Sequence, residues 1–237
     1  MPPPDLSVLT PQPLSDRALA IHHKLLSYYG NPAWGKPVAP LDELVSTILS
    51  QNTNDLNRDR AYTALRVRFP TWESVRDAET QEVIGAIRPA GLANQKGPRI
   101  QNILREITAK IGSLSLEFLE SLPTEEARQW LLQFKGVGPK TAAIVLLFSL
   151  NKPAFPVDTH IHRVTRRLGL VPAKASAEQA HQHLSGLFPV ETYAAAHLNL
   201  IRLGREICQA RRPNCPACPL QSMCDYYQSN FVAEESQ

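Results

Sequence analysis

The sequence predicts an all-α fold, and three observations support this prediction. Apolar residues recur at the spacing of amphipathic helices through most of the chain. No run of alternating residues bounded by turn residues reads as a strand, and no internal repeat is present. With 237 residues, 43% of them hydrophobic, the chain can bury a sizeable core of one or two domains.

The N-terminal region begins with a proline-rich stretch. The first fifteen residues are expected to form a loose extension that ends at Ser15 or Asp16. Either of these could cap a helix whose apolar residues run from Ala18 to Tyr28. Residues 31–40 contain three prolines and a glycine, so they are expected to form a linker.

A series of helices is expected to follow the linker. An amphipathic stripe runs from Leu41 to Leu49, and further candidates are residues 55–69, 72–78, 81–87, 99–111 and 124–134. Residues 141–150 differ because they are apolar on every side, which is typical of a helix buried among others. The last predicted helices are 158–168, 176–188, where Ser176 and Gln179 form a capping box, and 191–208.

The overall charge is nearly balanced, and its distribution is more informative. The net charge of +3 does not by itself point to a polyanionic partner. Between residues 135 and 172, however, six basic residues accompany a single acid, Asp158. This segment could face phosphates, although a solvated helix face has the same composition.

The sequence shows no membrane helix and no export signal. Its longest apolar stretch, Ala142 to Phe148, is far shorter than the roughly 20 residues that span a bilayer. The N-terminus has no basic region, apolar core or small-residue cleavage site, so we expect an intracellular protein in a reducing compartment. The four cysteines all fall within 17 positions, a poor arrangement for stabilising a fold of this length by disulfides.

These cysteines have the spacing Cys208-x6-Cys215-x2-Cys218-x5-Cys224, with prolines between them. Four thiolates can hold one tetrahedral zinc ion or a cubane [4Fe-4S] cluster. Zinc ribbons usually have two Cys-x2-Cys pairs and this chain has one, so the spacing favours the cluster. Unligated core cysteines are a weaker interpretation, because prolines and the basic residues Arg211 and Arg212 surround them.

A second motif is Phe134-Lys135-Gly136-Val137-Gly138-Pro139-Lys140-Thr141. The two glycines permit a tight turn whose backbone can approach a phosphate, and Pro139 suits the first turn of the next helix. On pattern alone this could be an ordinary helix connection. Lys140 adds chemistry, because desolvation and a helix N-terminus both favour the neutral, nucleophilic amine.

Asp158 follows within Val157-Asp158-Thr159-His160, directly before a predicted helix. An Asp at this place is most often an N-cap, but capping and catalysis are compatible. Such a carboxylate could stabilise a cationic intermediate or accept a proton from a lysine. His160 and His162 lack further ligands at metal-binding spacing, so we expect a DNA or packing role for them.

Together and in this order, the glycine-rich turn with Lys140, the Asp158 motif and the cysteine run closely resemble the endonuclease III family of helix-hairpin-helix DNA glycosylases. The likeness extends from about Leu41 to Cys224. It implies a six-helix barrel domain with the helix-hairpin-helix motif at residues 36–152. Residues 1–35 and 153–237 would form a second helical domain that holds the cluster, with the substrate cleft between the two.

The resemblance also implies a reaction, the removal of oxidised pyrimidines in base excision repair. Lys140 would attack the sugar C1′ of the damaged nucleotide, expel the base and form a Schiff base, which is followed by β-elimination of the 3′ phosphate. Asp158 would assist base departure. Leu92, in Gly91-Leu92-Ala93-Asn94-Gln95-Lys96, matches the leucine that the family inserts as a wedge.

The expected DNA contacts are Gly136, Val137, Gly138, Thr141, Gln51, Asn52, Leu92 and His160. Some positions depart from the family pattern. Asn52 stands where an inserting glutamine is expected, and the neighbouring Gln51 is an alternative for that role. Ala93 replaces an aromatic residue after the wedge, and Phe134-Lys135 replaces Leu-Pro.

Two rival interpretations remain open. Monofunctional adenine-mismatch glycosylases with the same cluster typically lack a lysine at the position of Lys140 and carry an extra C-terminal domain, whereas this chain stops 13 residues after Cys224. A non-catalytic DNA-binding module would use Lys140 only as a phosphate contact. We expect a monomer that binds double-stranded DNA with damaged bases or abasic sites and has no membrane partner. Its expected location is the cytoplasm, with the nucleoid if the source is bacterial.

Overall fold

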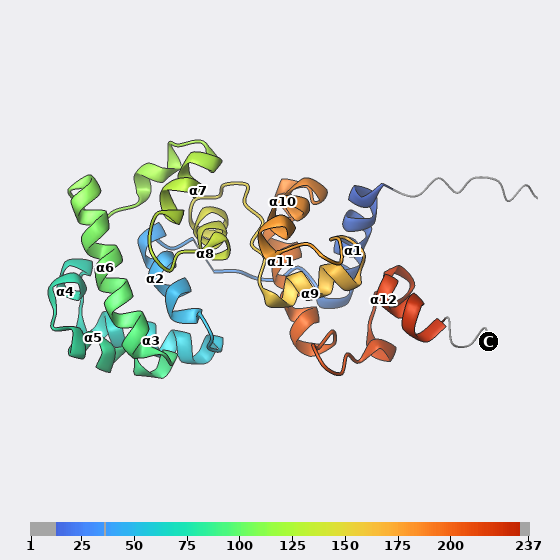
Figure 1. Ribbon diagram of the computed structural model, residues 1–237, viewed down its shortest axis with the longest axis horizontal. Coiled ribbons are helices and arrows are strands. Elements are labelled where there is room, and N and C mark those ends of the chain that lie inside the picture. Colours follow the sequence, from blue (N-terminus) through green and yellow to red (C-terminus); the bar gives the residue numbers. More distant parts are fainter. Residues whose placement is uncertain (1–12, 36, 233–237) are drawn as a thin grey trace, which may run out of the picture. The chain divides into compact units, whose positions relative to one another are not determined.

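A computed structural model describes residues 13–35 and 37–232 of the chain, and it is helical throughout (Figure 1). No strand occurs among these residues, so the predicted all-α class is confirmed. None of the helices in these two ranges is both long enough and apolar enough to cross a membrane.

The chain divides into two compact helical units. Of the described residues, those up to 34 and from 157 onward form the first unit, and those between 35 and 156 form the second. From the sequence, the boundaries between the two domains were expected between residues 35 and 36 and between residues 152 and 153.

In the first unit the α-helices are α1 (Leu14–Tyr29), α9 (Thr159–Arg167), α10 (Ala177–Leu187), α11 (Tyr193–Glu206) and α12 (Asp225–Tyr227). Shorter 3-10 or π turns there are η4 (Val190–Thr192), η5 (Cys215–Ala217), η6 (Gln221–Met223) and η7 (Gln228–Val232).

In the second unit the α-helices are α2 (Pro40–Ser50), α3 (Asp55–Arg68), α4 (Trp72–Asp77), α5 (Thr80–Ala86), α6 (Ala93–Ile111), α7 (Thr124–Leu132) and α8 (Pro139–Ile144). The turns there are η1 (Arg88–Ala90), η2 (Glu117–Glu120) and η3 (Val145–Ser149).

The core of the second unit forms around α6 and α2. Helix α6 packs against α4 and α5, and α2 packs against α3 and α8. The predicted stripe of α6 is buried, with Ile100, Ile103, Leu104 and Ile107 at most 2% exposed. As predicted for a helix apolar on every side, none of residues 139–150 is exposed.

The first unit brings the two ends of the described chain together. Helix α1 packs against α10 and α11, and α11 packs against α9. Gly204 on α11 allows this last approach, because a Cβ at that position would lie 2.8 Å from the Cβ of His160 on α9. The predicted capping box of Ser176 and Gln179 is present at the start of α10.

Two predicted helix starts are wrong. Helix α1 begins at Leu14 after Pro13, so Ser15 and Asp16 lie in its first turn and neither is its cap. The proline supplies the pre-set φ that a helix start needs. Most of the expected loose extension lies in residues 1–12, outside the described residues.

Helix α6 begins at Ala93 and not at Arg99, and it continues through Pro98. A proline inside a helix removes one hydrogen bond, and the packing of α6 against α4 and α5 offsets that loss. The other helices lie where predicted, with ends displaced by a few residues.

Candidate active site and metal centre

The glycine-rich motif forms a tight turn between α7 and α8 (Figure 1). The Val137 N–H donates to the Phe134 carbonyl at 3.0 Å, and Gly138 precedes Pro139, the first residue of α8, as predicted. Below the turn, Phe134 is 1% exposed and packs edge-on against Trp130, with ring centroids 4.9 Å apart. Phe134 therefore anchors the turn in the core.

The two glycines of this turn have different reasons to be glycine. Gly136 has φ +93°, and a Cβ there would lie 2.4 Å from Cδ of Arg99. Gly138 has an ordinary φ of −99°, and nothing lies within 4 Å of the place where its Cβ would be. Gly136 is thus required by the fold of the turn, whereas Gly138 leaves an open surface.

Lys140 is the second residue of α8 and is half-buried. Its neighbours Val137 and Thr141 are 5% and 4% exposed. The side chains of Val137 and Thr141 therefore belong to the core, and their predicted DNA contacts could come only from their backbone.

Gln51, at the end of α2, is tied to the same turn. Its Nε2 donates to the Gly136 carbonyl at 3.2 Å, and its Oε1 accepts from Nη1 of Arg99 at 3.0 Å. The next residue, Asn52, is exposed and has φ +55°. Gln51 therefore supports the turn, while Asn52 projects from the surface, a distinction that the sequence left open.

Leu92 lies at the start of α6 in a left-handed conformation, with φ +49° and ψ +30°, and is 48% exposed. A left-handed backbone is uncommon for a non-glycine residue, and exposing a large apolar side chain adds to the cost. Such strain is typical of functional positions.

Lys96 is a residue that the sequence reasoning missed. Its side chain is 2% exposed, and its ammonium donates to the carbonyls of Leu49 and Ala90, both at 2.8 Å. Burial lowers the pKa of the Lys96 side chain, and the positive charge of Arg99 lowers it further. Lys96 lies four residues before Ile100 and therefore on the buried stripe of α6. A predicted helix that began at Ala93 would have included Lys96 and indicated that it is buried.

Asp158 lies in the first unit and caps α9, as its position predicted. Its Oδ1 accepts from the Ile161 N–H at 2.8 Å, and the residue is half-buried. The cap bond uses one oxygen of the side chain.

Two arginines of the basic segment, both on α9, bond the end of α11 and the chain that follows it. Arg163 donates to the carbonyls of Cys208 and Gly204 at 3.0 and 2.9 Å, and to Nδ1 of His160 at 3.1 Å. Arg167 donates to the Gln209 carbonyl at 2.8 Å. These two arginines of the basic segment therefore bond backbone carbonyls of their own unit.

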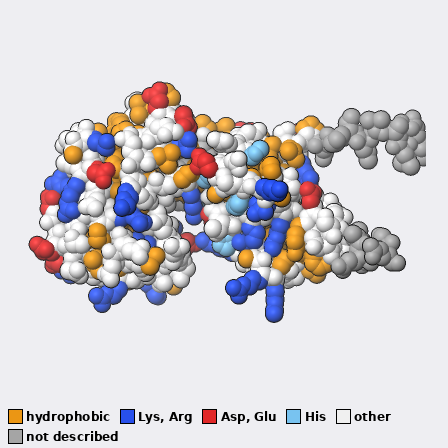
Figure 2. Space-filling view, in the orientation of Figure 1, with side chains coloured by type: hydrophobic (Ala, Val, Ile, Leu, Met, Phe, Trp, Pro, Cys, Tyr) orange, Lys and Arg blue, Asp and Glu red, His pale blue; other side chains and the backbone are white. Residues whose placement is uncertain are grey.

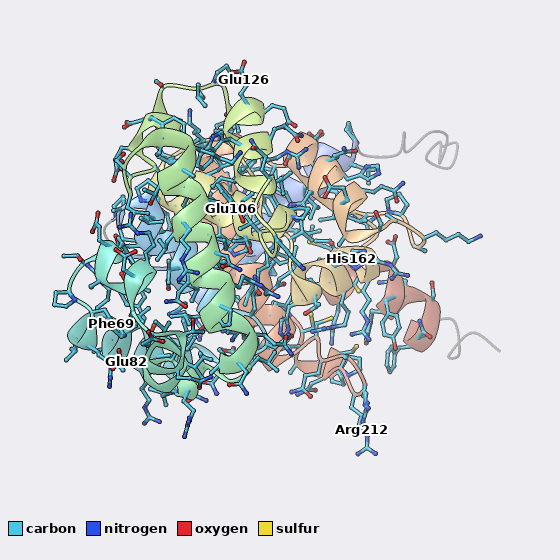
Figure 3. All side chains as sticks on the ribbon, turned by 60° about the vertical axis from the view of Figure 1, so that its left-hand side comes forward. Phe69, Glu82, Glu106, Glu126, His162 and Arg212 are labelled. Carbon is cyan, nitrogen blue, oxygen red and sulfur yellow. The ribbon has the colours of Figure 1, made fainter. Side chains whose placement is uncertain are left out.

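His162 is also engaged locally, since its Nε2 lies 2.9 Å from the Ala175 carbonyl. Figure 3 labels it on α9. Lys152, in the second unit, donates to the carbonyls of Glu120 and Leu122 at 2.9 and 2.5 Å. Half of the six basic residues of the segment, Lys152, Arg163 and Arg167, are thus committed to internal hydrogen bonds.

The four cysteines line one cavity of the first unit, together with Arg167, Tyr226 and Tyr227. Nη1 of Arg167 lies 3.3 Å from Sγ of Cys208, and its guanidinium stands 4.7 Å from the centre of the Tyr226 ring. Residues from α9, η5, the end of α11 and the start of α12 therefore converge here.

The chemistry of this donor set suits a cationic centre. Burial, and to a smaller extent the neighbouring thiols, raise the pKa of the Cys215, Cys218 and Cys224 thiols, and that of Cys218 rises to about 11. Four thiolates would repel one another unless a cationic centre lay among them, and a metal keeps its thiol ligands deprotonated.

Within the described residues, no three His, Cys, Asp or Glu side chains converge closely enough to ligate a single metal ion. One zinc ion needs its sulfurs at about 2.3 Å. A cubane distributes four thiolates over four iron atoms, so its ligands need not converge on one point, and four thiols that line one cavity fit it.

Exposed basic residues surround the first cysteine, namely Arg202, Arg205, Arg211 and Arg212. Figure 2 shows Lys and Arg side chains over the loop that follows α11, and in Figure 3 Arg212 points away from this loop. Arg202 differs from the others, because it pairs with Glu206 at 2.9 Å and lies over the Tyr29 ring at 4.4 Å.

Comparison with known proteins gives consistent matches. A family model described as "HhH-GPD superfamily base excision DNA repair protein" matches residues 45–190. Endonuclease III of Thermotoga maritima is 34% identical over 199 residues, which are 84% of this chain and 89% of that protein. An Arabidopsis thaliana protein, named provisionally as a DNA glycosylase, is 44% identical over 151 residues, 64% of this chain. The match covers about half (52%) of that Arabidopsis protein's length.

Among solved structures, a trapped covalent intermediate of endonuclease III with DNA superposes with a TM-score of 0.78 at 26% identity. The superposition covers 94% of this chain and 100% of the other. Both helical units of the chain therefore have counterparts in one known fold.

Proposed function

Because the chain belongs to the HhH-GPD superfamily of base excision DNA repair proteins, we propose that it is a DNA glycosylase with AP lyase activity on double-stranded DNA. The observation that carries the proposal is the position of Lys140. It follows the glycine turn directly, in a fold shared with a protein trapped in a covalent intermediate with DNA.

In the proposed reaction, the Lys140 amine forms a bond to C1′ of the damaged nucleotide while the bond from C1′ to the base breaks. The electron pair leaves with the base, which takes up a proton. The C1′–O4′ bond of the sugar then breaks, its electron pair goes to O4′, which takes up a proton, and C1′ forms a double bond to the Lys140 nitrogen. The resulting Schiff base makes the C2′ proton acidic. Loss of that proton breaks the bond to the 3′ oxygen, so the 3′ phosphate leaves by β-elimination.

Asp158 has a place in this scheme that its cap geometry allows. Its carboxylate would accept the proton that Lys140 loses and would stabilise the positive charge that builds on the sugar. Lys140 belongs to the second unit and Asp158 to the first.

The proposed substrates are oxidised pyrimidines, whose bases must leave the helical stack before Lys140 can reach C1′. Exposed Asn52 and strained Leu92 are the residues we assign to the vacated space. The open face of Gly138 is assigned to the approach of the DNA backbone.

The proposed cofactor is a [4Fe-4S] cluster held by Cys208, Cys215, Cys218 and Cys224, and its support is the ring of four thiols around one cavity. All four ligands would be protein thiolates, which leaves no open position for substrate. We therefore assign the cluster a structural role, holding the end of α11 with Arg205 and the following loop with Arg211 and Arg212 for contact with the DNA backbone. The monomeric state and the cytoplasmic location stay predictions.

Borohydride reduction tests the lyase step, because it converts a lysine Schiff base into a permanent bond. The protein should form a trapped complex with duplex DNA that contains an oxidised pyrimidine or an abasic site. Lys140→Ala should abolish the complex. Lys135→Ala is the matched control, since it removes an exposed lysine of the same turn and should leave trapping intact.

The result also separates the rival functions. A monofunctional glycosylase would release base without trapping, and a binding module would do neither. Undiminished trapping by Lys140→Ala would exclude Lys140 as the nucleophile.

A further inference from the structure

The buried ammonium of Lys96 has no part in the reaction proposed above. Its two hydrogen-bond partners at 2.8 Å are backbone carbonyls, those of Leu49 and Ala90. Burying a charge is unfavourable unless hydrogen bonds compensate for it, and a neutral side chain would fill the same space at lower cost. The position of the two carbonyls gives a reason for the charge.

Both carbonyls belong to the C-terminal ends of helical segments. Leu49 lies in the last turn of α2, and Ala90 is the last residue of η1. Carbonyls at helix ends lack partners further along the helix, and a cation is favoured there. A single ammonium therefore joins two helix ends that are 41 positions apart in the sequence.

A non-glycine residue with positive φ follows each of these carbonyls. Among the described residues, the non-glycine residues with positive φ are Asn52, Leu92 and Asn151. Asn52 comes three positions after Leu49, and Leu92 two positions after Ala90. We call residues 50–53 the Asn52 tip and residues 91–93 the Leu92 tip. Strained backbone persists only where the surrounding structure holds it firmly.

We propose that Lys96 is a positioning residue that joins the bases of the Asn52 tip and the Leu92 tip, so that both enter the DNA stack at one fixed spacing. This inference rests on the proposed function and deepens it, because it assigns base extrusion to a unit of two coupled tips. Gln51 adds a second link, since it ties the Asn52 tip to the Gly136 carbonyl of the turn before Lys140.

The same helix offers a matched control. Gln101 on α6 is 0% exposed, and its Nε2 donates to the carbonyls of Val75 and Ala78 at 3.0 and 2.8 Å. These carbonyls belong to the end of α4 and not to either tip. Gln101 also accepts from Oγ1 of Thr80 at 2.7 Å, so Gln101→Met removes two hydrogen bonds to backbone and one to a side chain. Lys96→Met removes two hydrogen bonds to backbone, and it is the variant that uncouples the tips.

The experiment measures kcat/KM for base release on two duplexes with the same oxidised pyrimidine. In one duplex the lesion is paired with adenine, and in the other it stands opposite a base with which it cannot pair. Extrusion costs less from a mismatch. Both rates come from one preparation, so the ratio of paired to mismatched rates does not depend on how much of a variant is folded.

Lys96→Met should lower this ratio about tenfold relative to wild type, which corresponds to about 1.4 kcal/mol in the extrusion step. Gln101→Met should leave the ratio unchanged, even if its melting temperature falls as far. Lys96→Gln keeps N–H donors but is neutral and one bond shorter, so it should lower the ratio by a smaller factor.

Wild-type ratios for both Lys96 variants would overturn the inference, as would an equal fall for Gln101→Met. A wild-type protein that releases no base from either duplex would instead overturn the proposed function.

Discussion

Asp158 can serve as a helix cap and as a reacting group at once, because the two roles use different properties of its carboxylate. The cap needs only an oxygen that accepts from the Ile161 N–H. The proposed chemistry needs the negative charge. Asparagine keeps the first property and lacks the second, so a single substitution can separate them.

Asp158→Asn is therefore expected to keep the fold and lose activity. Asn and Asp are about equally good N-caps, so the melting temperature should hardly change. Base release should fall about 100-fold or more, the usual contribution of a positioned acid or base. Thermal unfolding and single-turnover base release measure the two effects.

Ser176→Asn is the control for Asp158→Asn, since it also exchanges one capping residue for another, at α10 of the same unit. It should change neither quantity. If Asp158→Asn kept full activity, the cap would be the only role of Asp158.

At the scale of elements, the two glycines of the turn between α7 and α8 have different roles. One is needed for the fold of the turn, and the other is assigned to DNA binding. Gly136 needs its left-handed φ and has Arg99 against it, whereas Gly138 has neither constraint. The Gly136 carbonyl also accepts from Gln51. Gly136 is thus tied to the rest of its unit, whereas Gly138 faces open space.

Alanine at the two positions should give opposite results. Gly136→Ala should lower the free energy of unfolding by about 1–3 kcal/mol, the typical cost of a strained backbone conformation. Gly138→Ala should change it by less than about 0.5 kcal/mol. Urea denaturation measures both.

The effect of Gly138→Ala should appear in its affinity for DNA. A methyl group at residue 138 would stand where we expect the DNA backbone, so Gly138→Ala should weaken binding of abasic DNA despite its stable fold. Full affinity in Gly138→Ala would mean that the DNA approaches elsewhere.

For the whole molecule, the cysteine cavity is expected to act as a structural anchor of the first unit. Arg163 and Arg167 of α9 bond the carbonyls of residues 204 and 208–210, and the cavity follows directly on that segment. A cluster there would connect α9, α11 and the segment up to α12 around one centre.

Protein purified without oxygen should therefore contain about four iron atoms per chain. Cys215→Ser, at the most buried of the four positions, should lower the iron content and make residues 208–224 sensitive to proteases. Metal analysis and limited proteolysis measure these outcomes. Stoichiometric zinc without iron would contradict the cluster.

The sequence by itself determined the features that depend on local pattern. Helical periodicity gave the all-α class, Ser176 and Gln179 gave the capping box, and Asp158 gave the start of α9. Each follows from residues within a few positions of one another, where side-chain spacing and backbone hydrogen bonds decide the outcome.

Only the tertiary structure decided which side chains are free to act. Gln51 and Asn52 are adjacent and equally polar, yet Arg99 and Gly136 hold the first while the second stays exposed. The charge of Lys96 is buried against carbonyls 47 and 6 positions away. Hydrogen bonds and burial between distant segments depend on how helices pack, and local sequence carries too little information to specify that.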